Sequence, residues 1–446
     1  MLNRRELLSQ WSLGFGGLAL AELLAQEDAN ASQTKTHFAP KAKSVIFLYM
    51  AGGPSHLDLF DPKPAILKYA GQRPKEVNLR TERVTGGLLP PTAKFRPGGK
   101  CGTEISDLLP HLRERADDMC VVRSLIGGNP NHIPAANFLF SGRIDQIHPS
   151  LGAWTSYGLG SANKNLPMFV SLKKGTTASR YVRNGYLPGE FQGTPIDASG
   201  KSPEQMVRYL RNPELSRTKQ RQQLEFIQLL NRNHRQQSGA DAALDARIRA
   251  METAFRMQFS AGEALDLQTE RQSTRKLYGE GWFANGCLLA RRLIERGVRY
   301  VHLEHGSWDD HDKISRNIPR HAKEVDQPMA ALLTDLKQRG LLDETLVIWG
   351  GEFGRTPVSE NGDGRDHNHY GFSIWMAGGG IKGGMTYGAT DDFGFKAVKN
   401  RMTCHDLHAT ILHLLGMNHE KLTYRYSGRD FRLTDVHGEV VHDILA

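Results

Sequence analysis

The sequence predicts an α/β protein with a mostly parallel central sheet, on three observations. Short apolar runs of strand length recur, and segments with a helical pattern alternate with them. Several runs are apolar throughout, as in sheets buried on both faces. A polar cluster follows each of four runs, which end at Met50, Ser124, Leu303 and Trp349. Ligands of open α/β sheets bind at the carboxyl ends of strands, so the four clusters should converge on one edge.

The first half of the chain is expected to hold three strands and two short helices. Glycines after the first strand allow a sharp turn, and residues 65–100, which are rich in Gly and Pro, should be surface loop. The elements expected, in order, are a strand at Ser44–Met50, a helix at Ile105–Leu112, a strand at Met119–Ser124, a helix at Pro134–Phe140 and a strand at Pro167–Leu172.

The second half begins with a change of composition. Residues 204–278 are rich in Gln, Arg, Ala, Glu and Leu, which predicts two or three long surface helices, as a lid or an inserted arm. A later helix should begin with a capping box of Thr403 and Asp406. The elements expected, in order, are helix Trp282–Arg296, strand Val298–Leu303, helix Asp326–Arg339, strands Leu346–Trp349 and Phe372–Met376, helix Thr403–Leu415 and a closing strand or hairpin within residues 427–445.

Residues 1–31 are predicted to be an export signal. The Arg4–Arg5 pair resembles a twin-arginine signal, and Ala29–Ala31 offers a small-residue cleavage site. The alternative is an ordinary amphipathic helix. The apolar segment is too short to span a bilayer and no other stretch is long enough, so no membrane span is expected in the mature chain. The signal predicts a periplasmic or extracellular protein.

The chain of 446 residues has a formal net charge of +9. This charge indicates either an anionic partner, such as a polyanionic polysaccharide, an ester of phosphate or sulfate, or an acidic surface, or only a solvated basic surface. Nucleic acid is disfavoured because no block of like charge occurs. The four cysteines match no zinc pattern; a Cys101–Cys120 disulfide and buried free thiols both remain open.

The clusters after the strands contain residue types that bind metals or transfer protons. His56 and Asp58 follow the first strand and suit a metal, although Asp58 also suits the cap of a turn. Asp309 and His311, two apart in a loop, can both reach one cation, and this favours a metal site there. The remaining candidates are Asn131 and His132 before a helix start, where backbone N–H groups can hold an anion, and Glu352, Arg355, Asp363, Asp366, His367 and His369 after Trp349.

Eight segments together resemble one family over nearly the whole chain after the signal. It is the exported family catalogued as domain of unknown function 1501, which resembles, more distantly, the alkaline phosphatase and sulfatase superfamily. The segments are GGPSHLDLFDPKP (52–64), NPNHIPAANFLFSGR (129–143), GSWDDH (306–311), TLVIWGGEFGRTP (345–357), GRDHNH (364–369), AGGGIKGG (377–384), DLHATILHLLG (406–416) and GRDFRLTDVHG (428–438).

The resemblance to the superfamily implies an α/β/α sandwich and one or two divalent cations, Zn, Ca, Mn or Mg, which activate a phosphate or sulfate ester. Carried over by position, the implied metal ligands are His56, Asp58, Asp309, His311, Glu352, Asp366 and His367, with His369 as a rival for the last.

The sequence departs from that superfamily at two places. Asn131 and His132 stand where the superfamily carries a Ser, Thr or Cys-derived nucleophile, and Glu352 replaces an Asp-His pair. His132, as nucleophile or general base, Asn131 and Arg355 are therefore the catalytic candidates.

The expected function is an exported, metal-dependent hydrolase of anionic small-molecule or polysaccharide esters. The alternative is a non-catalytic relative that binds a metal or a glycan. An oxidoreductase is disfavoured, since AGGGIKGG lacks the GxGxxG layout.

Overall fold

A computed structural model describes residues 36–446, except 78–79, 146–147, 176, 178, 209, 211–213 and 239–241. The export signal predicted at 1–31 therefore lies outside the described residues. Among the described helices, none has the length and apolar character needed to cross a membrane.

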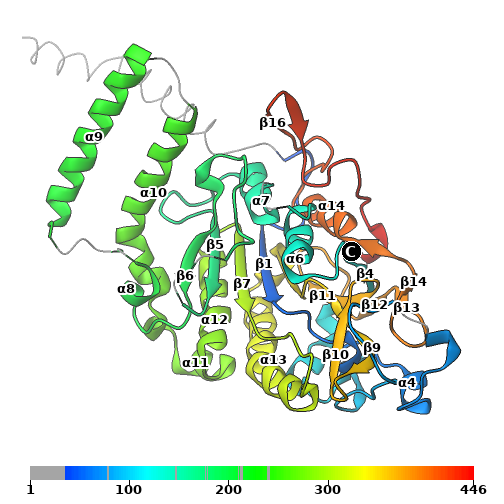
Figure 1. Ribbon diagram of the computed structural model, residues 1–446. Coiled ribbons are helices and arrows are strands. Elements are labelled where there is room, and N and C mark those ends of the chain that lie inside the picture. Colours follow the sequence, from blue (N-terminus) through cyan, green and yellow to red (C-terminus); the bar gives the residue numbers. More distant parts are fainter. Residues whose placement is uncertain are drawn as a thin grey trace, which may run out of the picture.

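A nine-stranded sheet forms the centre of the described structure (Figure 1). Its order is β12-β4-β11-β8-β1-β7-β5-β6, and β15 pairs with β4. Only β11 runs against its neighbours, so the mostly parallel sheet is confirmed. The strands are β1 (Ser44–Met50), β4 (Met119–Ile126), β5 (Phe169–Lys173), β6 (Thr194–Asp197), β7 (Tyr300–His305), β8 (Thr345–Gly350), β11 (Phe372–Ala377), β12 (Met385–Tyr387) and β15 (Met402–Thr403).

Helices cover both faces of this sheet, as expected for an α/β/α sandwich. Alternate residues of β1 point to opposite faces: Ile46 and Leu48 enter one core, and Val45 and Phe47 enter the other. The first core also holds buried side chains of α5 (Pro110–Arg113), α12 (Trp282–Glu295) and α13 (Ile314–Gln338). The second holds those of α6 (His132–Ser141), α7 (Leu151–Leu159) and α14 (Cys404–Leu414).

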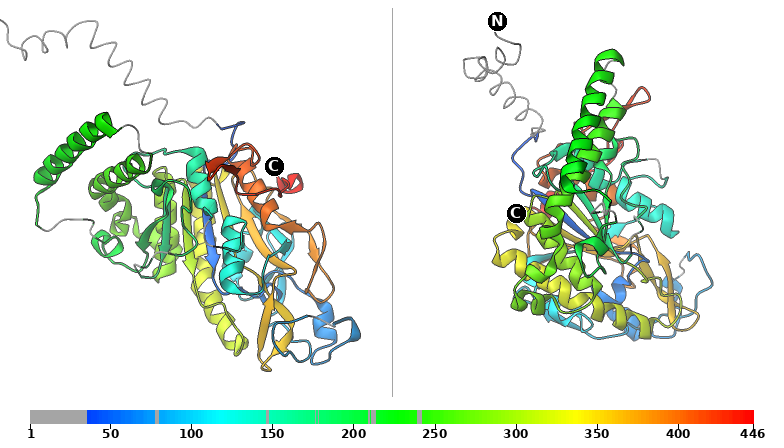
Figure 2. Two further views of the ribbon diagram at one scale, coloured as in Figure 1. Left: turned by 45° about the horizontal axis from the view of Figure 1, so that its top comes forward. Right: turned by 90° about the vertical axis from the view of Figure 1, so that its left-hand side faces the viewer.

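The segment predicted as long helices contains four helices, and two of them project from the sandwich (Figures 1 and 2). Part of α10 packs into the first core through Met257, Ala261 and Leu265. The helices are α8 (Pro203–Met206), α9 (Arg217–Ser238), α10 (Ala242–Leu265) and α11 (Gln272–Tyr278).

Two helix predictions need correction. The helix predicted at Ile105–Leu112 is wrong: β3 (Thr103–Ser106) pairs with β2 (Phe95–Gly98), and only the short α5 follows. A proline is favoured in the first helical turn, and Asp326 accepts hydrogen bonds from the first free N–H groups of α5. Helix α13 begins twelve residues before the predicted start at 326, because its apolar spacing continues back to Ile314 across Pro319.

The loop predicted between Trp349 and Phe372 is a β-hairpin. Strands β9 (Gly354–Glu360) and β10 (Gly364–Asn368) pair antiparallel. Both strands are almost fully buried although they carry Arg355, Arg365 and Asp366. Charged side chains at buried positions hide the alternation that reveals a strand.

Several smaller expectations are also decided. Thr403 and Asp406 form the predicted capping box of α14. All four cysteines are free thiols; Cys101 is exposed and the other three are buried. The tail begins with a separate two-stranded hairpin, outside the central sheet. The remaining short elements are α3 (His56–Leu59), α4 (Pro64–Lys68), β13 (Ala389–Thr390), β14 (Ala397–Lys399), β16 (Tyr424–Tyr426) and β17 (Arg429–Phe431).

Candidate metal centre

Four side chains from three parts of the chain meet at one edge of the sheet. His132 opens α6 just after β4, Asp309 and His311 follow β7, and His367 lies in β10, which leads into β11. Because β11 runs against its neighbours, its beginning reaches the edge where β4, β7 and β8 end. The sheet therefore brings together residues up to 235 positions apart, from 132 to 367.

Asp309 is at the centre of this group. Its Oδ1 lies 2.9 Å from His311 Nε2 and 3.2 Å from His367 Nε2. Its Oδ2 lies 3.2 Å from His132 Nε2, and the Nε2 atoms of His311 and His367 are 2.9 Å apart. One donor atom from each of the four residues lies within 4.8 Å of the others, so all four can contact a single ion.

The other ring nitrogen of each histidine is held by an acceptor. His132 Nδ1 lies 2.6 Å from Glu352 Oε1, and His311 Nδ1 lies 2.5 Å from Glu360 Oε2. His367 Nδ1 lies 2.6 Å from the carbonyl oxygen of Pro130. A carbonyl or carboxylate oxygen only accepts, so each Nδ1 carries a proton, and the Nε2 of the neutral ring keeps its lone pair toward Asp309. Metal-binding histidines in proteins are oriented in this way.

Buried groups hold the surroundings of this cluster in place. The Glu352 carboxylate accepts hydrogen bonds from the Tyr49 hydroxyl, at 2.9 Å, and from the Gly52 N–H, at 3.0 Å. Arg355 is fully buried; its Nη2 lies 2.6 Å from Asp309 Oδ1, and its Nε donates to the Gly53 carbonyl at 2.9 Å. Arg355 therefore fixes Asp309 against the loop that follows β1.

The pKa values describe where protons sit in the metal-free cluster. Burial lowers the pKa of His132, but the carboxylates of Asp309 and Glu352 raise it by more, to about 9. The pKa of His311 is also raised: burial opposes this shift, and Asp309 and Glu360 cause it. Burial opposes the low pKa of Asp309, which the three histidines and Arg355 hold well below its ordinary range. His367 has a lowered pKa because of burial and the charge of Arg355.

The donor set fits a first-row transition metal. Three imidazole nitrogens and one carboxylate oxygen suit Zn²⁺, whereas Ca²⁺ and Mg²⁺ prefer oxygen ligands throughout. His132 Nε2 is buried and lies 3.2 Å from Asp309 Oδ2 without a well-aligned hydrogen bond, so a cation can bind it once its proton is lost. The additional proton of His132 is a positive charge that a cation would replace.

Other residues predicted as ligands have different partners. Glu352 orients His132. Asp366 accepts from the N–H groups of His367 and Arg83, each at 2.8 Å, and belongs to a second converging group with His311 and Glu360. The ring of His369 lies against that of Tyr370, 4.0 Å between centroids.

His56 and Asp58, on α3 after β1, are not brought to the cluster. Asp58 is fully buried and pairs with Arg365, 2.9 Å from oxygen to Nε. His56 Nε2 lies 2.8 Å from the Gly394 carbonyl. The exposed Asn131 is the N-cap of α6, and its side chain makes no capping bond.

Sequence reasoning did not select three groups that support the cluster: Glu360, the Pro130 carbonyl and Tyr49. Glu360 ends β9, a strand that the sequence did not reveal, and a carbonyl leaves no trace in a sequence. Tyr49 lies on an apolar strand where a core role explains it equally well. Only the alternation within β1, which points Tyr49 toward the face covered by α6, gives a signal.

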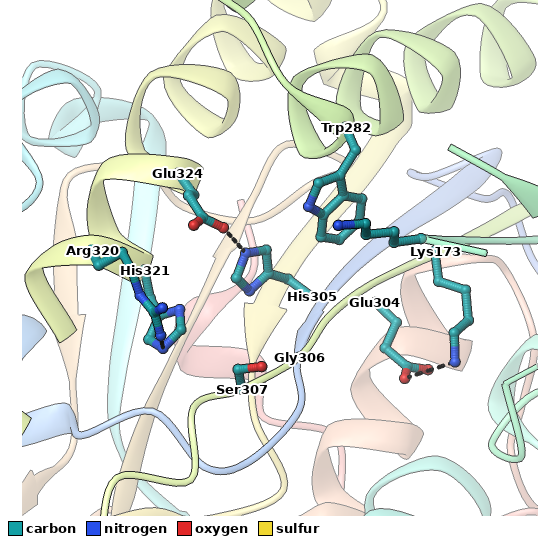
Figure 3. A pocket seen from close by; sticks show the side chains of 10 residues that line it. Lys173, Trp282, Glu304, His305, Gly306, Ser307, Arg320, His321 and Glu324 are labelled. Carbon is teal, nitrogen blue, oxygen red and sulfur yellow. Dashed lines mark hydrogen bonds and ion pairs between the residues drawn. The ribbon is translucent and has the colours of Figure 1, made fainter. Parts of the chain in front are cut away.

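A second histidine cluster lies at the end of β7, just before the loop that carries Asp309 and His311. It lines a cavity of about 370 Å³ (Figure 3). It contains His305, His321 and Glu324. Trp308 Nε1 donates to His305 Nδ1 at 3.0 Å, and His305 Nε2 lies 3.0 Å from Glu324 Oε2. An indole N–H only donates, so the proton of the neutral His305 is on Nε2 and is given to Glu324. No lone pair of His305 is left for a cation, and this donor set does not fit a metal.

A larger cavity has a volume of about 750 Å³. It is lined by Ile133, which follows His132, and by Ala51, which follows β1. Lys173, Arg180 and Arg183 give it a basic wall. Glu304 is the acidic residue in its lining and has Lys173 at 3.5 Å. The wall can attract an anion to this cavity.

The sequence matches the family described as "Protein of unknown function (DUF1501)" over residues 42–445. No curated protein matches it. Among solved structures, it is similar to a sulfatase from Pseudoalteromonas sp., at 13% identity, 88% of this chain, 70% of that chain and a TM-score of 0.37. The chain is also similar to the lipoteichoic acid synthase from Listeria monocytogenes, with 10% identity and a TM-score of 0.39. That match covers 92% of this chain and 80% of the synthase chain. A third similar structure is a phosphonate monoester hydrolase from Silicibacter pomeroyi, with 11% identity and a TM-score of 0.33. That match covers 84% of this chain and 73% of the hydrolase chain.

Proposed function

The chain belongs to the family "Protein of unknown function (DUF1501)", and we propose that it is a metal-dependent hydrolase of sulfate or phosphate esters. One observation carries the proposal: three imidazoles, each anchored through Nδ1 by an acceptor, direct Nε2 at one carboxylate. Without a cation, protons on the imidazoles and the Arg355 guanidinium balance the Asp309 carboxylate, and once the rings are neutral their Nε2 lone pairs point to one place where a cation can bind.

His132, Asp309, His311 and His367 would hold the ion, and the imidazoles favour Zn²⁺ over Ca²⁺ or Mg²⁺. This assignment makes His132 a ligand rather than a nucleophile. A divalent cation bound here supplies a Lewis acid that polarises an ester oxygen. Glu352, Glu360 and the Pro130 carbonyl orient the three rings, and Arg355 holds Asp309.

The substrate is proposed to be anionic, with polysaccharide esters included. The basic wall formed by Lys173, Arg180 and Arg183 would hold its negative charge. None of the four clustered residues has a hydroxyl or thiol, and Asn131 and His132 occupy the place of the superfamily nucleophile. We therefore propose direct attack by water, with no covalent ester on the chain. Export by the twin-arginine-type signal, and a single domain over 44–446 that includes the 204–278 insertion, belong to the same proposal.

A metal- or glycan-binding protein without hydrolase activity is the second candidate. The missing nucleophile favours it, because catalysis then depends on water alone. The hydrolase and a metal-binding protein differ in turnover and agree in metal content, whereas a glycan-binding protein needs no metal.

The test is to purify the exported chain from a host that processes its signal, and to measure its metal content and its activity on a panel of aryl sulfates and aryl phosphates. Asp309→Ala is the test variant, and Glu324→Ala in the second cluster is its matched control. A hydrolase binds metal and loses both metal and turnover in Asp309→Ala only. Metal without turnover selects the binding protein. The absence of any bound metal contradicts the hydrolase and a metal-binding protein, and leaves only a glycan-binding protein.

A further inference from the structure

Helix α9 exposes an apolar face. Four large side chains on it are about half exposed: Phe226 (60%), Ile227 (48%), Leu229 (47%) and Leu230 (50%). They occur within five consecutive positions and cover one side of the helix, since residues three and four apart are neighbours. Scattered single apolar residues are normal on a protein surface, but a contiguous group of this size marks an interaction site.

This face points away from α10. Gln228 bonds through its side-chain amide to Glu252 of α10, 2.6 Å between Nε2 and Oε1, and so marks the side of α9 that faces its neighbour. Leu224 and Gln220, one and two turns before Gln228, are partly buried on the same side. The exposed apolar residues lie on the other side of the helix, and Figures 1 and 2 show α9 projecting from the sandwich.

The charge of α9 is strongly basic. Its sequence contains five Lys and Arg residues and a single acidic residue, Glu225. Lys219, Arg221 and Arg232 are exposed. Glu225 is already matched by Arg221, 3.3 Å away. A helix with an exposed apolar face, a cationic polar face and low overall hydrophobicity lies in a membrane interface rather than across the bilayer.

We propose that α9 docks the protein on an anionic lipid surface. The apolar face enters the boundary between headgroups and acyl chains, and the basic residues draw the helix to the lipid phosphates. The charge decides between lipid and a second copy of the chain, because two copies of this helix repel each other while an anionic bilayer attracts it. The proposal is independent of the metal centre, whose residues follow β4 and β7 or lie in β10, and none of which belongs to α9.

Vesicle sedimentation with the full mature chain tests the proposal. One set of vesicles is phosphatidylcholine and the other is phosphatidylcholine mixed with phosphatidylglycerol. The chain should sediment with the mixed vesicles and far less with phosphatidylcholine alone. The double variant Phe226→Ser, Leu230→Ser should bind the mixed vesicles at least about tenfold more weakly, since two large apolar contacts are lost. Lys219→Gln with Arg232→Gln should weaken binding about fivefold per residue.

The matched control is Val398→Ser with Val436→Ser, two exposed apolar residues outside α9. It should bind vesicles as the wild type does. Every substituted residue is exposed, and circular dichroism with thermal melting checks that each variant is folded. Equal binding by the Phe226/Leu230 variant and the wild type overturns the proposal, as does the absence of binding to mixed vesicles. Light scattering identifies the competing occupant: a wild-type dimer that the Phe226/Leu230 variant breaks, without vesicle binding, assigns the face to a second copy.

Discussion

Two histidine clusters include residues of one short stretch, from the end of β7 to His311, and they differ in the direction of the hydrogen bonds that hold their rings. In each ring, the near nitrogen faces the carboxylate of its cluster and the far nitrogen is the other one. At Asp309, the far nitrogens of His132, His311 and His367, which are Nδ1, all donate to acceptors. At Glu324, the far nitrogen of His305 accepts from the Trp308 indole. When the rings are neutral, the nitrogens that face Asp309 in the first cluster have lone pairs, whereas the nitrogen of His305 that faces Glu324 carries a proton. The partner of the far nitrogen, rather than the number of histidines, decides which cluster suits a cation.

The two clusters also differ in what surrounds them. Burial lowers the pKa of His321 to about 4, so that ring stays neutral near neutral pH. At the first cluster two carboxylates raise the pKa of His132 to about 9. A proton held so firmly marks a place where positive charge is favoured, and a divalent cation supplies more of it.

The largest expected difference between the clusters is in metal content. Asp309→Ala removes the carboxylate shared by three imidazoles and should reduce bound zinc from about one ion per chain to nearly none. Glu324→Ala should leave the zinc content unchanged. Elemental analysis after dialysis against zinc-buffered solution checks both. Equal zinc loss in the two variants would contradict the distinction between the clusters.

The pH dependence should also separate them. Below about pH 9 a cation must displace the proton of His132, so zinc affinity should fall about tenfold per pH unit as pH falls, and more steeply where His311 is also protonated. The metal-free fold behaves in the opposite sense. Because the pKa of His132 is raised on folding, its protonation stabilises the metal-free fold. This contribution is fully present below about pH 6.5 and is lost as pH rises through about 9. Zinc competition titrations and metal-free melting curves from pH 6 to 9.5 check the two signs.

Weakening the acceptor of one far nitrogen tests whether that hydrogen bond contributes to zinc affinity. Glu352→Gln and Glu360→Gln keep the size of each side chain but remove the charge that orients His132 or His311. Each should lower zinc affinity about 10–100-fold without abolishing binding. Competition with a chelator measures this. Glu344→Gln, an exposed glutamate paired with Lys43 at the surface, is the control and should not change affinity. Wild-type affinity in both anchor variants would mean that the rings need no such orientation.

The smallest effect is expected from moving the proton of His305 from Nε2 to Nδ1 in the second cluster. Trp308→Phe removes the indole donor, so that the His305 proton can move to Nδ1 and free Nε2 toward Glu324. The variant should gain weak zinc binding as a second site per chain. Its stability should fall by about 1–3 kcal/mol, because a buried hydrogen bond is lost in the core. Calorimetric zinc titration and urea unfolding check these outcomes. A single site in the variant would show that the hydrogen-bond direction does not control this cluster.

Much of this arrangement could be predicted from the sequence, and the physical reasons are specific. The strands Ser44–Met50 and Thr345–Gly350 are apolar throughout, so they stand out as buried strands. Polar clusters after strands then place Asp309, His311 and His367 at one edge. The hairpin of β9 and β10 was missed because its buried positions carry Arg355 and Arg365, whose charges are paired only in three dimensions.

The same cause limits what sequence reasoning says of single residues. Asp58 resembles a ligand in sequence, but Arg365, 307 positions away, takes its charge. His305 and His311 are both histidines of one loop region, and only the partners of their far nitrogens separate them. Those partners, Trp308 and Glu360, are set by packing and strand pairing rather than by spacing along the chain.

The most direct test of the central claim is anomalous diffraction at the zinc edge from crystals of the full mature chain loaded with zinc. We expect one strong peak per chain, enclosed by His132, Asp309, His311 and His367, and none at His305, His321 and Glu324. A peak at the second cluster, a peak at His56 and Asp58, or no peak in zinc-loaded crystals would contradict the account.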